Sequence, residues 1–215
     1  MERIVLFTDS LALPRKVPEV TSIEDTYPYL LKKNFDVYQF SKGGCLISEL
    51  IEQTFYYSQY RPDYVILQCG IVDCAPRAFS WSEESFMRLT RIGRLLRKVI
   101  SVTITTKRIR NIRRKSWTNI KSFECLCNSF INQFDGIPVY ALSILPATSE
   151  YELQVPGISK KIEEYNIVLS RVFGDRLIDL SGIPVEGIMS DHHHLTQKGH
   201  IYVYELIMDK LKKAY

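Results

Sequence analysis

Short runs of β-branched and aromatic residues alternate along this chain with longer stretches in which apolar residues recur at helical spacing. The short runs predict strands and the longer stretches predict helices. The predicted strands are Arg3–Thr8, Asp36–Phe40, Tyr64–Gln68, Pro138–Ser143 and Arg176–Leu180. The predicted helices are Tyr29–Lys33, Cys45–Tyr60, Glu84–Ile100, Thr118–Phe134, Ser159–Phe173 and Thr196–Lys213. Ser159 and Thr196 are the expected N-caps of the last two helices.

Strands that alternate with helices of this length predict βαβ units and a parallel sheet covered on both faces. The expected fold class is therefore α/β, a three-layer α/β/α sandwich around a five-stranded, mostly parallel sheet. The 215 residues contain no repeat and no low-complexity run, so one domain spanning residues 1–215 is expected. Ligands of such sheets bind at the carboxyl ends of the strands, so candidate chemistry is sought there.

Composition indicates the class of protein and the compartment in which it is expected. No apolar stretch approaches the roughly 20 residues that span a bilayer, and the N-terminus lacks a small-residue cleavage site. The five cysteines, at positions 45, 69, 74, 125 and 127, are odd in number and scattered. That pattern argues against a disulfide framework and favours a reducing compartment, so a cytoplasmic location is expected. Cys125 and Cys127 have no second ligand pair at suitable spacing, and no zinc site is expected.

The charge is concentrated in one segment. The net charge is +4, but Ser85–Phe123 holds twelve Lys or Arg residues and no Asp or Glu. The rest of the chain therefore carries sixteen basic and twenty-four acidic residues, a balance of −8. We interpret residues 85–117 as a basic helix and insert. It is either solvated, or it contacts an anionic glycan-lipid or membrane surface through Arg88–Lys115. No nucleic-acid-binding signature is present, so no nucleic-acid partner is expected.

Two polar motifs at opposite ends of the chain carry candidate chemistry. "TDSL" follows the first strand, and "DHHHLTQKGH" precedes the last helix. Ser10 is either a turn serine or a nucleophile, which would need a neighbouring base. Asp191 and His194 are three residues apart, a spacing that lets a carboxylate orient an imidazole. A parallel sheet would bring both motifs to one edge, so the combination predicts a nucleophile with its base and acid.

With these two blocks the chain resembles the SGNH, or GDSL-type, serine hydrolases. "TDSL" matches three of the four positions of their Gly-Asp-Ser-Leu block, and the late block matches their Asp-x-x-His block. The resemblance implies a flavodoxin-like SGNH hydrolase fold. It also implies Ser10 as nucleophile, His194 as general base and Asp191 as orienting acid. The insert would then be a candidate lid beside the active site.

The resemblance also implies an oxyanion hole. Its backbone donors would be Ser10 and a glycine after the second strand, Gly44 or else Gly43. The family's Gly-x-Asn-Asp block reads Gly70-Ile71-Val72-Asp73 here, so valine replaces the asparagine donor. Loss of one such donor typically costs about 10²–10³ in rate. Three interpretations stay open: two backbone donors suffice, Arg77 substitutes for the amide, or the site only binds.

The function expected from this resemblance is a serine esterase that removes O-acyl groups, O-acetyl above all, from a carbohydrate. The chain also looks similar to members associated with surface-polysaccharide biosynthesis. The alternatives are a carbohydrate O-acyltransferase that uses the same triad and a non-catalytic glycan-binding module. Expected substrate-binding residues are Asp9, Asp73, Arg77 and His193, and neither a cofactor nor a metal is expected. Three adjacent histidines would form a strained metal site. His192 and His193 are expected at the mouth of the site or in solvent, and His200 within the last helix.

Overall fold

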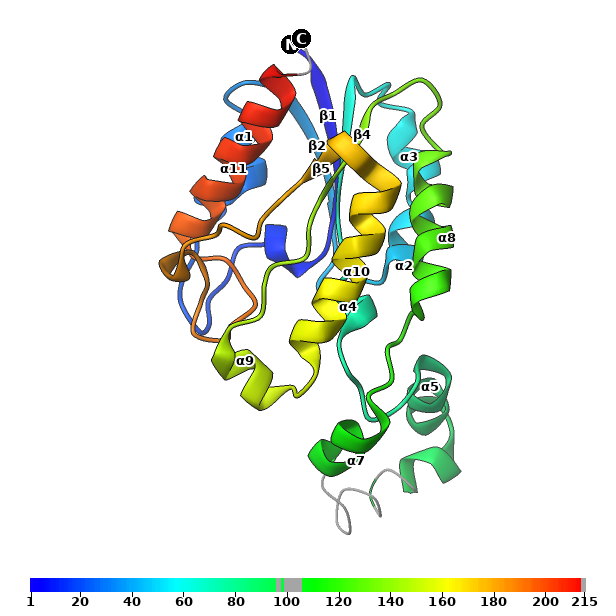
Figure 1. The fold of residues 1–215 in the computed structure, drawn as a ribbon. Coiled ribbons are helices and arrows are strands. Elements are labelled where there is room, and N and C mark those ends of the chain that lie inside the picture. The colour runs from blue at the N-terminus through cyan, green and yellow to red at the C-terminus, as the bar shows by residue number, and fades with distance from the viewer. Residues whose placement is uncertain (96–97, 99–105, 214–215) are drawn as a thin grey trace.

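The fold is built on one parallel sheet. The computed structural model describes residues 1–95, 98 and 106–213. Five parallel strands lie in the order β2-β1-β3-β4-β5 (Figure 1). Thr8 pairs with Ser41 on one side and with Gln68 on the other, so these three strands end at the same level. The strands are β1 Arg3–Thr8, β2 Asp36–Ser41, β3 Tyr64–Gln68, β4 Val139–Leu142 and β5 Leu177–Ile178.

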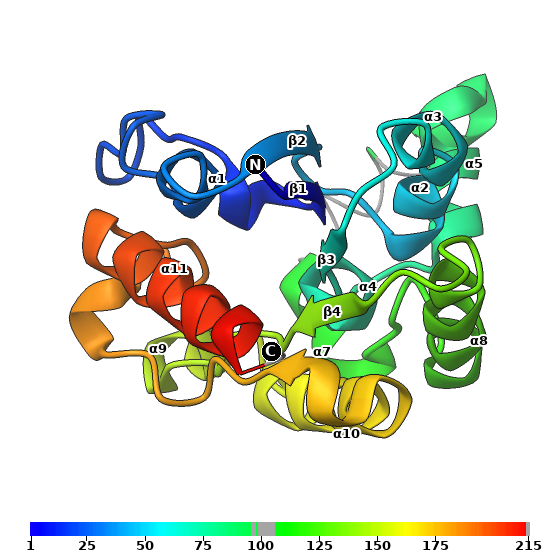
Figure 2. The ribbon, with the colours of Figure 1, turned by 90° about the horizontal axis from the view of Figure 1, so that it is seen from above.

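Helices cover both faces of the sheet (Figure 2). On one face lie α1 (Tyr27–Leu31) and α11 (Gln197–Lys212). On the other lie α2 (Ile47–Ile51), α3 (Thr54–Ser58), α8 (Ile120–Ile131) and α10 (Ile158–Phe173). The predicted three-layer α/β/α architecture is therefore confirmed. The other elements that lie wholly within the described residues are the short helices η1 Ser10–Ala12, α4 Ile71–Cys74, α5 Trp81–Leu89, α7 Thr106–Arg113, α9 Ser149–Gln154, η2 Gly174–Arg176 and η3 Val185–Gly187.

Alternating side chains of the strands supply the two halves of the core. Val5 and Phe7 of β1 pack toward α2, α8 and α10, whereas Ile4 and Leu6 pack toward α1 and α11. All four side chains are fully buried. A strand covered on both faces must be apolar at every position, which is why β1 and β3 read as continuous apolar runs.

The predicted elements recur with local differences. The predicted helix Cys45–Tyr60 is two helices, because the Thr54 hydroxyl donates to the Ile51 carbonyl at 2.7 Å and competes with helix continuation. Thr196 caps α11 as expected, by accepting from the Gly199 N–H. Ser159 is not an N-cap: α10 begins after Gly157, and the Ser159 hydroxyl donates to Glu152 at 2.7 Å. Helix α9, which carries Glu152, has no counterpart among the predicted elements.

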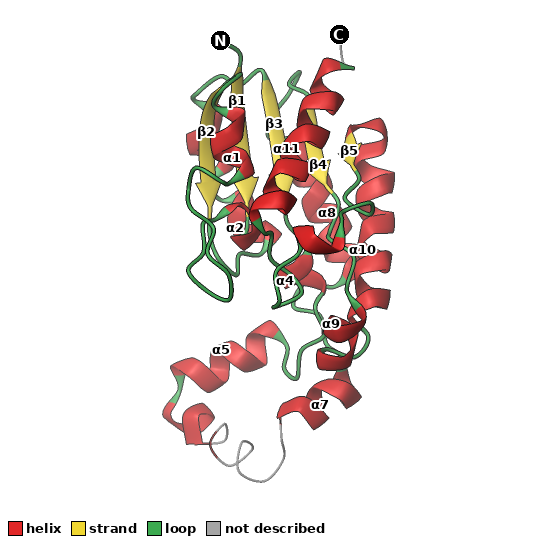
Figure 3. Cartoon of the chain, turned by 90° about the vertical axis from the view of Figure 1, so that its left-hand side faces the viewer, coloured by secondary structure: helices red, strands yellow, loops and turns green. Residues whose placement is uncertain are grey.

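The basic segment extends from the carboxyl edge of the sheet, where α5 and α7 lie below the strand ends (Figure 3). The predicted helix Glu84–Ile100 is wrong in its continuity, because the chain is extended at Thr90, where α5 ends. Leu89 is 82% exposed, so the expected apolar face is not buried there. Its continuation at Leu96 and Val99 lies outside the described residues. Within the described chain, no helix is long and apolar enough to cross a membrane.

A close backbone approach joins η3 to the first turn of α11. The carbonyl oxygen of Gly187 accepts from the Thr196 N–H at 3.0 Å, and Ile188 pairs with Leu195 in an antiparallel bridge. A Cβ at Gly199 would lie 2.0 Å from that carbonyl oxygen. The loop between the two bridging residues, which contains the tripled histidine, is therefore closed at its base by glycine.

We expect Gly199→Ala to destabilise the protein although alanine favours helices, because the added methyl collides with backbone rather than with a flexible side chain. Overpacking of this kind typically costs about 1–3 kcal/mol. Urea unfolding followed by circular dichroism measures the change. Gly43→Ala is the matched control, since a Cβ there meets no atom within 4 Å. Equal midpoints for Gly199→Ala and wild type would contradict the steric argument.

Candidate active site

Ser10 stands at the carboxyl end of β1. The Asp9 carboxylate accepts from the Leu11 N–H at 2.9 Å and so caps the short helix η1, of which Ser10 is the first residue. The Asp9 N–H is in turn bonded to Gln68 at the end of β3. The turn thus fixes Ser10 at the junction of the central strands, where α/β sheets bind ligands.

Asp191 and His194 lie on the loop closed by Gly187. The His194 carbonyl accepts from the Met189 N–H at 2.8 Å, and the Asp191 Oδ1 accepts from the His194 N–H at 3.1 Å. His192 takes a left-handed conformation, with φ of 67°, which turns the chain between the two residues. The loop is held by hydrogen bonds between its own residues, one from backbone to backbone and one from backbone to the Asp191 carboxylate.

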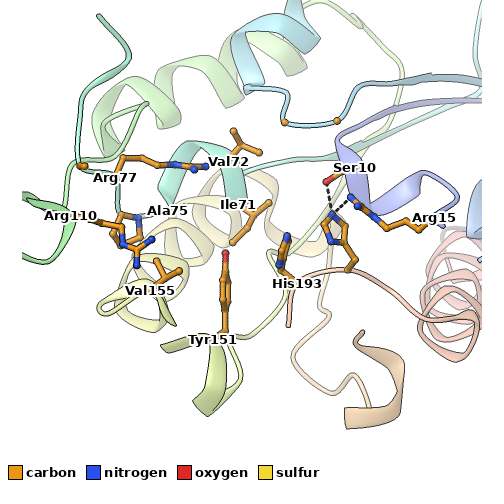
Figure 4. A pocket seen from close by; sticks show the side chains of 15 residues that line it. Ser10, Arg15, Ile71, Val72, Ala75, Arg77, Arg110, Tyr151, Val155 and His193 are labelled. Carbon is orange, nitrogen blue, oxygen red and sulfur yellow. Dashed lines mark hydrogen bonds between the residues drawn. The ribbon is translucent and has the colours of Figure 1, made fainter. Parts of the chain in front are cut away.

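The structure brings these three side chains together. His194 Nε2 lies 3.0 Å from Ser10 Oγ, and His194 Nδ1 lies 2.6 Å from Asp191 Oδ2 (Figure 4 shows the first contact). The acid therefore holds the imidazole with Nε2 toward the serine. This is the hydrogen-bonded order, acid to base to nucleophile, that activates a serine hydroxyl.

Burial lowers the pKa of His194 to about 4, aided by the neighbouring His193 and Arg15, and the hydrogen bond to Asp191 only partly offsets this. Burial raises the pKa of Asp191, but the hydrogen bonds from His194 and His193 and the nearness of both imidazoles together outweigh it and keep that pKa below its ordinary value. Near neutral pH the pair is therefore a neutral imidazole beside a carboxylate. A neutral imidazole is the form that can accept the serine proton.

Arg15 is a site residue that the sequence reasoning missed. Its guanidinium donates to the same His194 Nε2 that faces Ser10 (Figure 4). Its Nε is buried with no hydrogen-bond partner among the described residues. The only sequence signal is a basic residue five positions after the candidate nucleophile, and the loop that folds it back is a tertiary feature.

The expected oxyanion donors lie around the same pocket. Gly43 and Gly44 both line it, and Gly44 has φ of +71°, which favours glycine. Val72 also lines it, with its side chain 8% exposed, so an apolar group stands where the family carries an amide. Arg77 lies on the Val72 side of the pocket (Figure 4), stacked 4.3 Å over the Trp117 ring.

Two expected substrate-binding residues do not face the pocket. Asp9 and Asp73 are fully buried and are absent from its lining. Asp73 accepts from the Ile47 N–H at the start of α2 and from the Thr118 hydroxyl, and burial raises its pKa to about 7. Burial likewise raises the pKa of Asp9 to about 6. Both carboxyls hold backbone in place instead of touching a ligand.

His193 and His200 lie in different environments. His193 lines the pocket and stacks on Tyr151, with ring centroids 5.4 Å apart. His200 is buried in α11, where its Nδ1 accepts from the Tyr27 N–H at 3.3 Å. The ligand atoms of Asp191, His193 and His194 lie within 4.8 Å of one another, a spacing that suits a metal ion. However, His193 Nδ1 bonds the Asp191 carbonyl at 2.7 Å, and hydrogen bonds account for the cluster.

The pocket is an open cavity of about 730 Å³. Besides the predicted residues, its wall includes Arg110 from α7, Tyr151 from α9 and Val155 (Figure 4). Periodicity places residues on elements but does not show which distant element meets which. These three residues therefore carried no signal in the sequence. Part of the basic insert thus borders the site, as a lid would.

We expect the contribution of Asp73 to the free energy of unfolding to fall as pH rises from about 4 to about 7, against an opposite contribution from His194 and His200, whose pKa values burial lowers to about 4. The folded chain holds a proton on Asp73, with its pKa about 7, more tightly than the unfolded chain does near 3.8. Each unit of that difference is worth about 1.4 kcal/mol. Asp73→Asn should remove this contribution, so the stability difference between wild type and Asp73→Asn should fall as pH rises, while the parts due to Asp9, His194 and His200 stay in both proteins. Urea unfolding across this pH range measures it, with exposed Asp135→Asn as control. Parallel curves for Asp73→Asn and wild type would refute the prediction.

We also expect His194 to titrate well below an ordinary histidine. Because the Arg15 charge lowers the pKa of His194, Arg15→Gln should raise it. Carbon-detected NMR titration of the imidazole signals reports both values. Lys16→Gln removes a neighbouring exposed charge and serves as the control. A wild-type His194 pKa near 6.5 would count against this description of the site.

No protein-family model and no curated protein sequence matches the chain. Solved structures do. It is similar to a lipase/acylhydrolase from Enterococcus faecalis, with 17% identity, a TM-score of 0.68 and coverage of 100% of this chain and 97% of that one. It is similar to a protein described as lipolytic and of the G-D-S-L family from Desulfitobacterium hafniense, with 13% identity, a TM-score of 0.63 and coverage of 98% of this chain and 99% of that one. It is also similar to the acetyl xylan esterase AlAXEase, with 17% identity, a TM-score of 0.61 and coverage of 96% of this chain and 98% of that one. The chain has the α/β/α fold of these hydrolases, and the predicted SGNH-type fold is confirmed.

Proposed function

We propose that this protein is a serine esterase of the SGNH type that acts through an acyl-enzyme on Ser10. The observation that carries the proposal is the contact between Ser10 Oγ and His194 Nε2 at 3.0 Å, with Asp191 on the opposite nitrogen. The fold shared with lipases, acylhydrolases and acetyl xylan esterases supports it.

The first half of the reaction forms the acyl-enzyme. His194 Nε2 takes the hydroxyl proton of Ser10 while Oγ attacks the ester carbonyl carbon. The carbonyl oxygen becomes an oxyanion, which the N–H groups of Ser10 and of Gly44 or Gly43 would stabilise in this mechanism. As the tetrahedral intermediate collapses, His194 returns its proton to the leaving alcohol oxygen.

The second half releases the acid. Water takes the place of the alcohol, His194 removes one of its protons, and the hydroxide oxygen attacks the acyl carbon. Collapse then breaks the bond to Oγ, which regains a proton from His194. If a sugar hydroxyl replaces the water, the same site is an O-acyltransferase. The two activities differ only in the acceptor that reaches the acyl-enzyme.

We propose O-acetyl esters of a carbohydrate as the substrate class. The open cavity has room for a sugar ring beside Ser10, and one structural neighbour acts, by its description, on acetylated xylan. A link to surface-polysaccharide biosynthesis, a cytoplasmic location and a membrane or glycan-lipid contact through Arg88–Lys115 stay predictions.

Ser10→Ala should abolish labelling by a fluorophosphonate probe and lower turnover of 4-nitrophenyl acetate by on the order of 10³-fold or more, because no other group supplies the nucleophile. Labelling is read by gel fluorescence and turnover by absorbance. Ser170→Ala, an exposed serine of α10, is the control and should behave as wild type.

Three outcomes separate the candidate functions. Equal labelling and turnover in wild type and Ser10→Ala would overturn the esterase proposal and favour a glycan-binding module. Labelling with slow hydrolysis that speeds up on addition of a sugar acceptor, with acetyl recovered on that sugar, would favour the transferase. Labelling with turnover that is independent of acceptor would support the hydrolase.

A further inference from the structure

The wall of the pocket carries charge of one sign. Three arginines line it: Arg15, Arg77 and Arg110. No Asp or Glu occurs among the described residues that line it. A neutral sugar ester would need no such wall, because arginine forks are suited to carboxylate and phosphate groups.

Arg77 and Arg110 stand apart from the catalytic residues. Both lie on the far side of the pocket from Ser10, with Val72 and Tyr151 between (Figure 4). They come from different elements, since Arg77 follows α4 and Arg110 lies on α7. Two arginines from separate elements thus line the same end of the cavity.

The protein positions both guanidinium groups without neutralising them. Arg77 is held by backbone bonds to Lys115, at 2.7 and 3.1 Å, and by stacking on Trp117. Arg110 donates to the Gln154 carbonyl. The Nε atoms of both are buried without a hydrogen-bond partner among the described residues. Burial lowers the pKa of Arg77, as expected for a desolvated cation.

The nearby carboxylates are engaged elsewhere. Glu83 pairs with Arg113 at 2.7 Å, and Glu84 pairs with Arg88 at 3.1 Å. Arg113 and Arg88 therefore behave as surface cations of the basic segment, whereas Arg110 turns into the cavity. A desolvated arginine without a carboxylate is costly unless a ligand supplies the negative charge.

We propose that the substrate of this site carries an anionic group, a carboxylate or a phosphate, that seats between Arg77 and Arg110 while its ester carbonyl lies at Ser10. This inference rests on the proposed esterase function and narrows it to acidic esters, such as an O-acetylated acidic sugar. Arg110 is then a specificity-determining residue, and the basic insert contributes to the site through α7.

Matched ester pairs test the proposal. The carboxylate probes are 4-acetoxybenzoate, 4-acetoxyphenylacetate and 3-(4-acetoxyphenyl)propanoate, each compared with its neutral methyl ester, and 4-acetoxyphenyl phosphate is the phosphate probe. The acyl group is constant, and the series varies the distance between ester and anion. The measured quantity is the ratio of kcat/KM for anionic and neutral ester, corrected for their alkaline hydrolysis rates.

We expect wild type to prefer the anionic member of at least one pair, and this preference to shrink in 0.5 M salt. Arg110→Gln should lower the ratio by about 10-fold or more, the loss expected for a hydrogen bond to a charged group. Arg108→Gln is the control: it removes an exposed arginine from the same helix, outside the pocket lining. Arg77→Gln distinguishes two roles of Arg77. If Arg77 binds the anion, the substitution should lower the ratio of anionic to neutral ester. If Arg77 is an oxyanion donor, the substitution should lower kcat for both esters.

Equal kcat/KM for both members of every pair, or the same ratio in Arg110→Gln and wild type, would overturn the anion site while leaving the esterase intact. Direct binding separates the two proposals. In Ser10→Ala, NMR titration should show tighter binding of the preferred anionic ester than of its methyl ester, and Arg110→Gln in that background should remove the difference. If wild type shows no turnover and this binding is still observed, the anion site would be supported and the esterase proposal would be overturned.

Discussion

One hydrogen bond, from Ser10 to His194, depends on the whole fold, because 184 residues separate its two partners. Each end of the chain must be fixed independently. The pairing of β1 with β2 and β3 fixes the first, and α11 packed beside α1 fixes the second. The contact between Gly187 and Gly199 then sets where the loop leaves the helix. A small change in any of these would separate nucleophile and base without touching either.

Val72 sets the main chemical constraint on the site. Gly70 takes φ of 114°, and α4 follows directly. A Cβ at Gly70 would lie 2.6 Å from the Ile144 side chain, so the turn itself requires glycine. Val72 has no side-chain donor, so in the proposed reaction the oxyanion would depend on backbone N–H groups or on Arg77.

The sequence predicted the elements better than the pocket, and the reason is physical. Strand register and helix periodicity are local, so all five strands were located, and Thr196 was recognised as a cap. The proximity of Ser10, Asp191 and His194 could be predicted, because motif spacing and sheet topology bring them to one edge. Arg15, Arg110 and Tyr151 reach the pocket through loop conformation and the placement of α7 and α9. Asp73 was misjudged because its motif position does not show which way the carboxyl points.

Arg15 and Ser10 compete for the same nitrogen of His194. With Nδ1 bonded to Asp191, a neutral His194 offers one lone pair, at Nε2, and both the guanidinium and the hydroxyl point to it. One lone pair accepts one strong hydrogen bond, so Arg15 must yield before His194 can take the serine proton.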